Sequence, residues 1–355
     1  MKIALFCSSR NIISPTGIGG TEQPIYYLAR ELAKRNHQVS LYAAKGSKIR
    51  GVKVKEISPF VTFTKQKHLN IQERISSFYD LTALSNFFKN EADKFDIIQF
   101  NSYIFYEILP FVKFSKTPVI IRINYPHDLI YPYIKPYLKK IKNVYYLPIS
   151  HFIQSAMPDL KYLDPIYPAI NVNDFKFSKT PKDYLLFIGR VCYNKGSHIA
   201  IQIAKKAKKK LIIAGPINEP EPQEYFNQEI KPYLNKNIKY IGEVNFKEKI
   251  KLYQDAKATL FPIQWDEPFG NVPIESMACG TPVVAFDRGA MKESIKNKVS
   301  GFLIENGNIR KTTRAIKEIE KIDRKKVRKW AEDNFSIKKI VEQYEDIYQS
   351  ISKKR

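Results

Sequence analysis

Two glutamates with seven residues between them, Glu267 and Glu275, enclose a Phe-Gly pair in the most informative stretch of this sequence. The stretch follows an apolar segment at residues 258–261 and opens a segment of helical periodicity that ends near Gly280. Backbone N–H groups at a helix N-terminus lack partners within the helix, and together with the helix dipole they bind anions. A carboxylate at the mouth of such a site repels phosphate, so the stretch indicates a ligand with hydroxyl groups as well as an anionic part. A nucleotide sugar is such a ligand; an ordinary solvated helix start is the alternative interpretation.

Turns that contain glycine follow two other apolar segments. Residues 189–196 place the cations Arg190 and Lys195 between a predicted strand and a predicted helix. An arginine fork and a lysine point charge both bind phosphate, whereas two solvated loop cations are the alternative in so basic a chain. Residues 8–20 follow the first predicted strand and contain three glycines, which let the backbone approach a ligand closely. A plain turn is the alternative there.

A third polar group, residues 124–128, follows the apolar segment 119–123. It contains His127, one of five histidines, which could act on a ligand or be an ordinary exposed loop histidine. Asp128 is expected to cap the following turn. Tyrosines then alternate with lysines at residues 130–140, a composition that suits a membrane interface. Because this segment also holds two prolines, we favour an irregular segment packed on the first domain.

Apolar β-branched segments alternate with longer amphipathic segments along the whole chain, a pattern typical of parallel sheets built from βαβ units. The pattern restarts near residue 184, so we predict an α/β fold with two doubly wound domains in tandem and ligands in the cleft between them. The predicted strands are 2–7, 38–42, 97–99, 119–123, 147–149, 184–188, 211–214, 238–241, 258–261 and 283–286, and the predicted helices include 22–35, 79–95, one from 197 and one at 325–348.

The domain boundary is predicted within residues 165–181, which hold three prolines and several turn-forming Asn and Asp residues. We therefore expect an N-terminal Rossmann-like domain at 1–170, a C-terminal one at 171–335 and a terminal segment at 336–355.

Size and composition bound the class of protein. With 355 residues, 44% of them hydrophobic and 13% aromatic, the chain suits a packed protein of two domains. No apolar run is long enough to span a bilayer, and the N-terminus lacks the features of a signal peptide. Cys7, Cys192 and Cys279 show no disulfide or metal spacing, so we expect a reducing cytoplasm. Metalloprotease, P-loop, serine-hydrolase and paired-aspartate motifs are absent, so no bound metal is expected.

The net charge of +24 results from 59 Lys and Arg against 35 Asp and Glu. Such a field attracts polyanions, either nucleic acid or an anionic membrane surface. A solubilising surface in a lysine-rich proteome is the alternative. No zinc-finger, helix-turn-helix or RNA-recognition signature accompanies the charge, so no specific nucleic-acid partner is expected.

Together these motifs resemble the retaining glycosyltransferases of family 4, which have the GT-B fold of two Rossmann-like domains. The first loop, with Gly19 and Gly20 before Thr21 and Glu22, is similar to that of a bacterial subgroup described as UDP-glucose:tetrahydrobiopterin glucosyltransferase-like. The resemblance spans nearly the whole chain and is carried most specifically by residues 189–196, 213–215, 261–275 and 277–285, with 300–304 matching the family's next strand.

The resemblance implies a role for each motif. Arg190 and Lys195 would bind the donor pyrophosphate and stabilise the leaving nucleotide. Glu267 would hydrogen-bond hydroxyls of the donor sugar, and Glu275 would hold the ribose. Residues 336–355 would form a helix that crosses back to the N-terminal domain. Further donor contacts would come from Gly19 and Gly20 in the first loop, from Gly189, from the backbone of Phe269, Gly270, Asn271 and Val272, and, near the base, from Gly242, Glu243 and Val244.

One position departs from the family pattern. Family members usually carry a histidine just after the strand matched by residues 119–123, close to the transferred sugar, and that position is Asn124 here. His127 lies three residues later, so either side chain could take the histidine's place.

The leading hypothesis is a metal-independent retaining transferase without a cofactor, which moves a hexose from a nucleoside diphosphate, with UDP-hexose as the expected donor, to an unknown hydroxyl acceptor. It would be cytoplasmic, with peripheral contact with the inner membrane face left open, and it could serve cell-surface glycan or glycolipid synthesis. The alternatives are a UDP-sugar epimerase on the same fold and a non-catalytic polyanion-binding protein.

Overall fold

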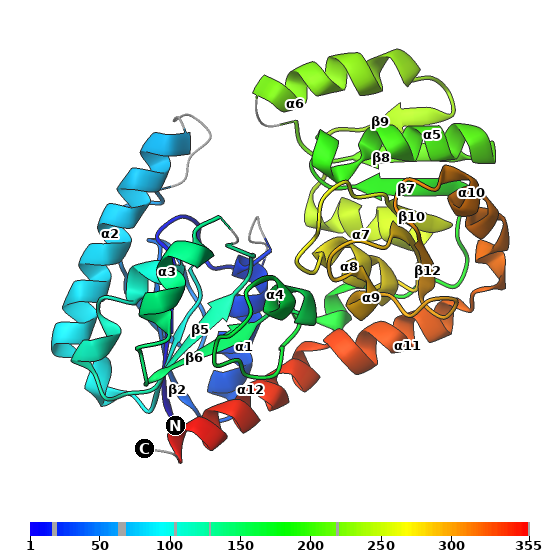
Figure 1. Ribbon diagram of the computed structural model, residues 1–355. Coiled ribbons are helices and arrows are strands. Elements are labelled where there is room, and N and C mark those ends of the chain that lie inside the picture. The colour runs from blue at the N-terminus through cyan, green and yellow to red at the C-terminus, as the bar shows by residue number, and fades with distance from the viewer. Residues whose placement is uncertain (16–19, 63–68, 103–104, 128, 218–219, 354–355) are drawn as a thin grey trace. The chain divides into compact units, whose positions relative to one another are not determined.

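A computed structural model describes residues 1–15, 20–62, 69–102, 105–127, 129–217 and 220–353 (Figure 1). The chain forms two compact units: unit 1 is Met1–Ala169 with Ile337–Arg355, and unit 2 is Ile170–Ser336. Each unit contains one six-stranded sheet, and neighbouring strands pair in parallel. The predicted fold class, two Rossmann-like α/β domains, is therefore confirmed.

The sheet of unit 1 has the strand order β3-β2-β1-β4-β5-β6. Its inner strands are mainly apolar, as parallel strands between helix layers usually are, and all five residues of β5 are buried. The strands are β1 (Lys2–Phe6), β2 (Gln38–Ala43), β3 (Lys53–Glu56), β4 (Ile97–Phe100), β5 (Val119–Ile123) and β6 (Val144–Pro148), and the α-helices are α1 (Glu22–Lys34), α2 (Leu69–Asn90), α3 (Tyr131–Leu138), α4 (His151–Ala156) and α12 (Ile337–Ser352).

Alternate residues of β1 point to opposite helix layers, because side chains alternate along a strand. Ile3 and Leu5 belong to the buried cluster that includes α1 and α12. Phe6 stacks on Tyr42 and meets the edge of Phe87 from α2. The two faces of the sheet thus have separate hydrophobic cores.

The sheet of unit 2 has the order β12-β11-β10-β7-β8-β9. The chain adds strands outward from β7 and then returns to add β10 on its other side, so the topological switch point lies between β7 and β10. The strands are β7 (Tyr184–Ile188), β8 (Lys210–Ala214), β9 (Ile238–Tyr240), β10 (Ala258–Phe261), β11 (Val283–Phe286) and β12 (Gly301–Ile304), and the α-helices are α5 (Ser197–Ala207), α6 (Pro220–Tyr225), α7 (Phe246–Asp255), α8 (Asn271–Ala278), α9 (Met291–Ser294), α10 (Ile309–Glu318) and α11 (Arg324–Phe335).

The last helix, α12, packs on unit 1 beside α1, as the resemblance implied (Figure 1). Tyr344 and Tyr348 are buried, and the Tyr348 hydroxyl donates to Gln99 Oε1 of β4 at 2.6 Å. Arg35 at the end of α1 donates to Glu345 at 2.7 Å. Apolar contact and an ion pair therefore both fix α12 on unit 1.

Every predicted strand is present, but four details of the prediction were wrong. The prediction missed β3 because this edge strand is polar, Lys-Val-Lys-Glu, as exposed edges often are. Helix α2 spans Leu69–Asn90 rather than residues 79–95. Residues 325–348 form two helices, because Ser336 has extended backbone with ψ of 139°.

The tyrosine- and lysine-rich segment is the fourth correction: it forms helix α3 rather than irregular structure. One of its prolines, Pro132, lies in the first turn, where no intrahelical N–H bond is lost. Pro136 removes one bond near the end of the helix, which the short α3 tolerates. Among the described residues, no helix combines the length and the apolar content needed to cross a bilayer.

Candidate functional site

A charged pair lies at the switch point of unit 2. Lys195 follows β7 and Glu267 follows β10, and the Lys195 Nζ donates to Glu267 Oε2 at 2.5 Å. The indole Nε1 of Trp265 donates to the same oxygen at 2.7 Å, and Lys195 Nζ lies 4.9 Å from the Trp265 ring centroid. Ligands of doubly wound sheets bind outside the carboxyl ends of the strands at this point. The structure therefore brings together two predicted site residues where a ligand is expected.

The loop after β7 and the loop after β10 contact each other through their backbones. Gly196 has φ of 74°, and a Cβ at this position would lie 2.0 Å from the carbonyl oxygen of Pro262. The backbone N–H of Gln264 donates to the carbonyl of Asn194 at 2.8 Å. Glycine is required at residue 196 because a side chain would push the loop after β7 away from the loop after β10.

A third loop fixes the backbone of Glu267. The Ala290 N–H donates to the Glu267 carbonyl at 2.9 Å. Gly289 has φ of 58°, and its Cβ would lie 2.2 Å from that same carbonyl oxygen. Since Glu267 is held from the loop after β11 as well, its carboxylate has a defined position.

Glycines end three neighbouring strands on the other side of the switch point. Gly189 follows β7 and donates to Ala214 O at 3.0 Å, and Gly215 follows β8 and donates to Gly242 O at 2.8 Å. A Cβ on Gly215 would lie 1.8 Å from the Gly189 carbonyl oxygen. At these glycines, backbone without side chains lines the carboxyl ends of β7, β8 and β9. Beyond Gly242 the chain continues with the exposed Glu243 and the half-buried Val244.

The N-terminus of α8 completes this edge. Gly270 precedes the helix with φ of 83°, and no side chain caps the helix or adds acidic charge in its first turn, residues Asn271 and Val272 included. Phe269 is 1% exposed and its ring meets Phe335 at 5.6 Å, so only its backbone is available to a ligand. The helix start therefore has the electrostatic character that favours an anion.

Glu275, the second glutamate of the pair, is turned toward α7. Lys249 Nζ donates to Glu275 Oε1 at 2.8 Å, and the Tyr253 hydroxyl donates to Oε2 at 3.0 Å. Burial, together with the Glu275 carboxylate, raises the pKa of Tyr253 well above its usual range. A ribose hydroxyl at Glu275 would share the carboxylate with these two donors.

Arg190, unlike the buried Glu275, is open to solvent, and an aromatic group follows it in the chain. Arg190 is exposed at the end of β7, directly after Gly189. Tyr193 stacks on His198 with ring centroids 5.0 Å apart. The Tyr225 hydroxyl shares a hydrogen bond of 2.7 Å with His198 Nδ1. Burial lowers the pKa of His198. This aromatic group could not be predicted from the sequence, because its members come from three separate elements.

In unit 1, Asn124 follows β5 and has a defined orientation. Arg122 Nε donates to Asn124 Oδ1 at 3.1 Å, which identifies the other amide atom as the nitrogen. That nitrogen is buried and has no hydrogen-bond partner among the residues that the structure describes. Burial lowers the pKa of Arg122 to about 10, so its guanidinium stays charged at neutral pH. The Asn124 Nδ2 group is therefore a buried donor without an acceptor, which lowers the stability of the fold unless a ligand accepts from it.

His127, the other candidate, lies in a separate aromatic setting. Its ring meets the edges of Tyr106 and Tyr125 at centroid distances of 6.1 and 5.9 Å. Its carbonyl accepts from Tyr131 at the start of α3. Gly20 is described and exposed, whereas Gly19 and Asp128 lie outside the described residues.

The first loop of unit 1 begins in a polar cluster that the sequence analysis missed. Asp80 of α2 accepts from Ser8 Oγ at 2.6 Å and from the Ser9 N–H at 2.8 Å. Burial raises the pKa of Asp80. Asp80 is far from the loop in sequence, so only the packing of α2 against β1 reveals the contact. Among the described residues, no three His, Cys, Asp or Glu side chains gather as a metal site requires.

Two family models match the chain. The model described as Glycosyl transferases group 1 matches residues 171–335, and the model described as Glycosyltransferase Family 4 matches residues 18–156. Between them the two models match most of the chain, and both describe glycosyltransferases. The resemblance drawn from the motifs is thus confirmed at the level of GT-B glycosyltransferases, while the tetrahydrobiopterin-related subgroup and the retaining mode stay predictions.

Similar proteins support the assignment to the glycosyltransferases. An uncharacterised glycosyltransferase of Methanocaldococcus jannaschii is 34% identical over 124 residues, which are 34% of this chain and 31% of that protein. The O-antigen chain mannosyltransferase RfbU of Salmonella typhimurium is 28% identical over 198 residues, which are 53% of this chain and 54% of RfbU. The matches therefore span between about a third and about half of these relatives. HepE of Anabaena, solved with UDP, shares the fold with a TM-score of 0.73 at 18% identity, over 99% of this chain and 100% of HepE.

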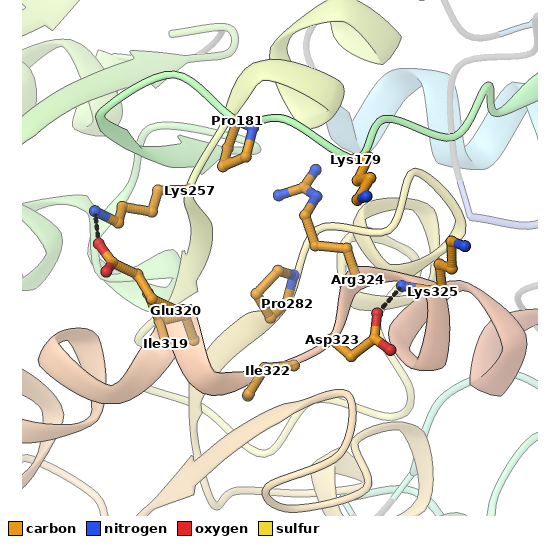
Figure 2. Close-up of a pocket in the computed structure, with 10 residues that line it drawn as sticks. All are labelled: Lys179, Pro181, Lys257, Pro282, Ile319, Glu320, Ile322, Asp323, Arg324 and Lys325. Atoms are coloured by element: carbon orange, nitrogen blue, oxygen red, sulfur yellow. Dashed lines mark hydrogen bonds and ion pairs between the residues drawn. The ribbon is translucent and has the colours of Figure 1, made fainter.

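A cavity of about 460 Å³ lies at the amino-terminal ends of the strands of unit 2, opposite their carboxyl ends (Figure 2). It is lined by residues that precede strands, Lys257 before β10 and Pro282 before β11. Two of its cations are engaged: Lys257 pairs with Glu320 and Asp183, and Arg324 donates to backbone carbonyls such as Ala256 O at 2.9 Å. This cavity is separate from the candidate donor site.

Proposed function

We propose that this chain is a retaining glycosyltransferase that moves a hexose from a nucleoside diphosphate, with UDP-hexose as the expected donor, to a hydroxyl group of an acceptor. The observation that carries the proposal is the Lys195–Glu267 pair at the switch point of unit 2. A cation and a carboxylate at one point, beside an uncapped helix start, suit a ligand that joins a diphosphate to a sugar. We further propose that unit 2, residues 171–335 in the domain prediction, binds the donor and that residues 1–170 take the acceptor.

The diphosphate would lie against cations and backbone. Arg190 is exposed and could fork onto the phosphate oxygens, and Lys195 would shift from Glu267 to the diphosphate as a point charge. The start of α8 at Gly270 would add its backbone N–H groups. These groups would stabilise the negative charge that grows on the departing nucleotide as the glycosidic bond breaks.

Glu267 of unit 2 is the proposed contact to the hexose. Its carboxylate would accept from the sugar hydroxyl groups once Lys195 shifts to the phosphate. In unit 1, Asn124 is proposed in the role of the family's usual histidine, because its buried amide N–H has no hydrogen-bond partner among the described residues. His127 is the weaker candidate because aromatic rings surround it.

Retention of the anomeric configuration follows from attack on the face that the nucleotide leaves. The acceptor oxygen would bond to the anomeric carbon while the bond to the diphosphate oxygen breaks, and the acceptor proton would pass to that departing oxygen. No protein nucleophile takes part in this scheme. The complex of HepE with UDP supports a uridine nucleotide, and the name of RfbU supports a hexose donor and an acceptor in glycan synthesis. We also propose peripheral contact with an anionic membrane, motivated by the net charge of +24.

The proposal is tested by incubating the protein with UDP-glucose, UDP-galactose or UDP-N-acetylglucosamine and a panel of hydroxyl acceptors. Acceptor-dependent release of UDP, with a product whose NMR coupling shows the donor's anomeric configuration, supports a retaining transferase. An inverted product contradicts retention alone. Epimerisation of a UDP-sugar without acceptor replaces the proposal with an epimerase. Oligonucleotide binding at physiological salt, with no nucleotide-sugar affinity, supports the non-catalytic alternative.

Replacing Glu267 with glutamine is expected to weaken UDP-hexose binding by about ten- to a hundredfold, the loss of one charged hydrogen bond, and to leave UDP affinity nearly unchanged. Isothermal titration with both ligands separates the two effects. Glu305→Gln is the matched control, because Glu305 also pairs with a lysine, Lys311, at 3.0 Å but on an exposed surface. Equal losses for UDP and UDP-hexose would show that Glu267 does not act on the sugar.

A further inference from the structure

Helix α3 of unit 1 presents a row of large apolar side chains to solvent. Leu129 is 86% exposed, Tyr133 85% and Tyr137 46%. These residues are four apart, so they lie along one side of the helix and the turn before it. Ile130 beside them is 38% exposed. Single exposed apolar residues are ordinary, but a row of them on one helix face indicates a contact surface.

The opposite side of α3 is firmly anchored. Tyr131 and Leu138 are buried, and the Tyr131 hydroxyl donates to the Pro158 carbonyl. Lys135 pairs with Asp159 at 2.6 Å. The exposed row therefore lies on a helix that is anchored to the rest of unit 1.

Positive charge surrounds the end of this row. Residues 129–142 contain four lysines and no acidic residue. Lys139, Lys140 and Lys142 are all exposed just after the helix. An aliphatic and aromatic row that runs into a lysine cluster matches the boundary of a bilayer, where tyrosines lie at headgroup depth and lysines meet anionic headgroups.

We propose that this surface, formed by Leu129, Tyr133 and Tyr137 with Lys139, Lys140 and Lys142, docks unit 1 onto an anionic lipid bilayer. The inference rests on the membrane contact in the proposed function and names where it occurs; it does not depend on the reaction. Charge complementarity selects an anionic partner. Leu129, with no polar group to offer a phosphate backbone, favours lipid over nucleic acid.

Vesicle flotation tests the surface, using liposomes of phosphatidylcholine alone or with phosphatidylglycerol. The wild type should float with the anionic vesicles and not with the neutral ones. Replacing the three lysines with glutamine should weaken binding about a hundredfold. The pair Leu129→Ser with Tyr133→Ser should weaken it at least about tenfold, because the apolar contribution is lost. Tyr133→Trp offers a direct readout, a blue shift of its emission on anionic vesicles.

The matched control replaces Lys321, Lys325 and Lys326, three exposed lysines of unit 2, with glutamine. It removes the same charge, so an equal loss in both triple variants would overturn the inference in favour of general electrostatics. Failure of the wild type to bind anionic vesicles, or full binding by the Leu129 and Tyr133 variant, would also overturn it. UDP-hexose titration of the same samples should be unaffected, which separates failure of this surface from failure of the donor site.

Discussion

Replacing Lys195 with alanine should lower kcat about 100- to 1,000-fold, the usual cost of removing one preorganised group that stabilises transition-state charge. The ammonium group lies 2.5 Å from Glu267 Oε2 and over the Trp265 ring, so it is already beside the site before it shifts to the diphosphate. A cation in a partly buried site stabilises a departing diphosphate far better than a solvated one. Steady-state rates of UDP release with the best acceptor measure the effect.

Lys329→Ala is the matched control for Lys195. Lys329 also pairs with a carboxylate, that of Asp333 at 3.0 Å, but its side chain is 73% exposed on α11. An exposed pair of this kind contributes little, so the control should retain full activity and stability. Calorimetry must show that Lys195→Ala is folded. If the folded variant keeps kcat within about threefold of the wild type, Lys195 does not stabilise the leaving nucleotide.

Replacing Gly196 with alanine should destabilise unit 2 by about 4 kcal/mol or more, because backbone strain and a steric clash act together. Gly196 has φ of 74°, and the added Cβ would lie 2.0 Å from the Pro262 carbonyl oxygen. Relief of the clash requires the loops after β7 and β10 to separate, which would also displace Lys195 from Glu267. Differential scanning calorimetry should show a lower Tm for unit 2, by about 8 °C or more.

Gly307 provides the control for the strain alone. It has the same φ of 74°, and a Cβ there would have no neighbour within 4 Å. Gly307→Ala should therefore cost only about 1–2 kcal/mol, the left-handed backbone penalty. Equal Tm losses in the two variants would show that the loops of unit 2 do not depend on close approach at residue 196.

The strands were predictable from sequence because parallel strands buried on both faces are nearly continuous apolar runs, as Tyr184–Ile188 illustrates. The charged edge strand Lys53–Glu56 carries no such signal. Likewise, periodicity could not distinguish helix from irregular structure in a segment as rich in proline and tyrosine as α3.

The candidate site was predictable in part. The glycines near Lys195 and Glu267 made these two residues predictable, because close approach of the backbone requires glycine. Trp265 was not identified, although it lies two residues before Glu267 and donates to its carboxylate. The sequence also could not reveal that Glu275 faces Lys249 and Tyr253, because those residues reach it through the packing of α7 against α8.

The central claim is that the carboxyl edge of unit 2 binds a nucleotide sugar, and a thermal-shift titration tests it most directly. The ligands are UDP, GDP, ADP and their hexose conjugates, added to the wild type, Arg190→Ala, Glu267→Ala and the exposed control Arg314→Ala. At a hundred times its Kd a ligand stabilises by about 2.7 kcal/mol, which shifts the Tm by about 5–10 °C for a unit of this size. We expect one nucleotide sugar to shift the wild type and Arg314→Ala, and the shift to fall to about half or less in the other two variants. If no nucleotide or nucleotide sugar shifts the wild type, while oligonucleotides or anionic lipids do, the assignment of this edge as a donor site is contradicted.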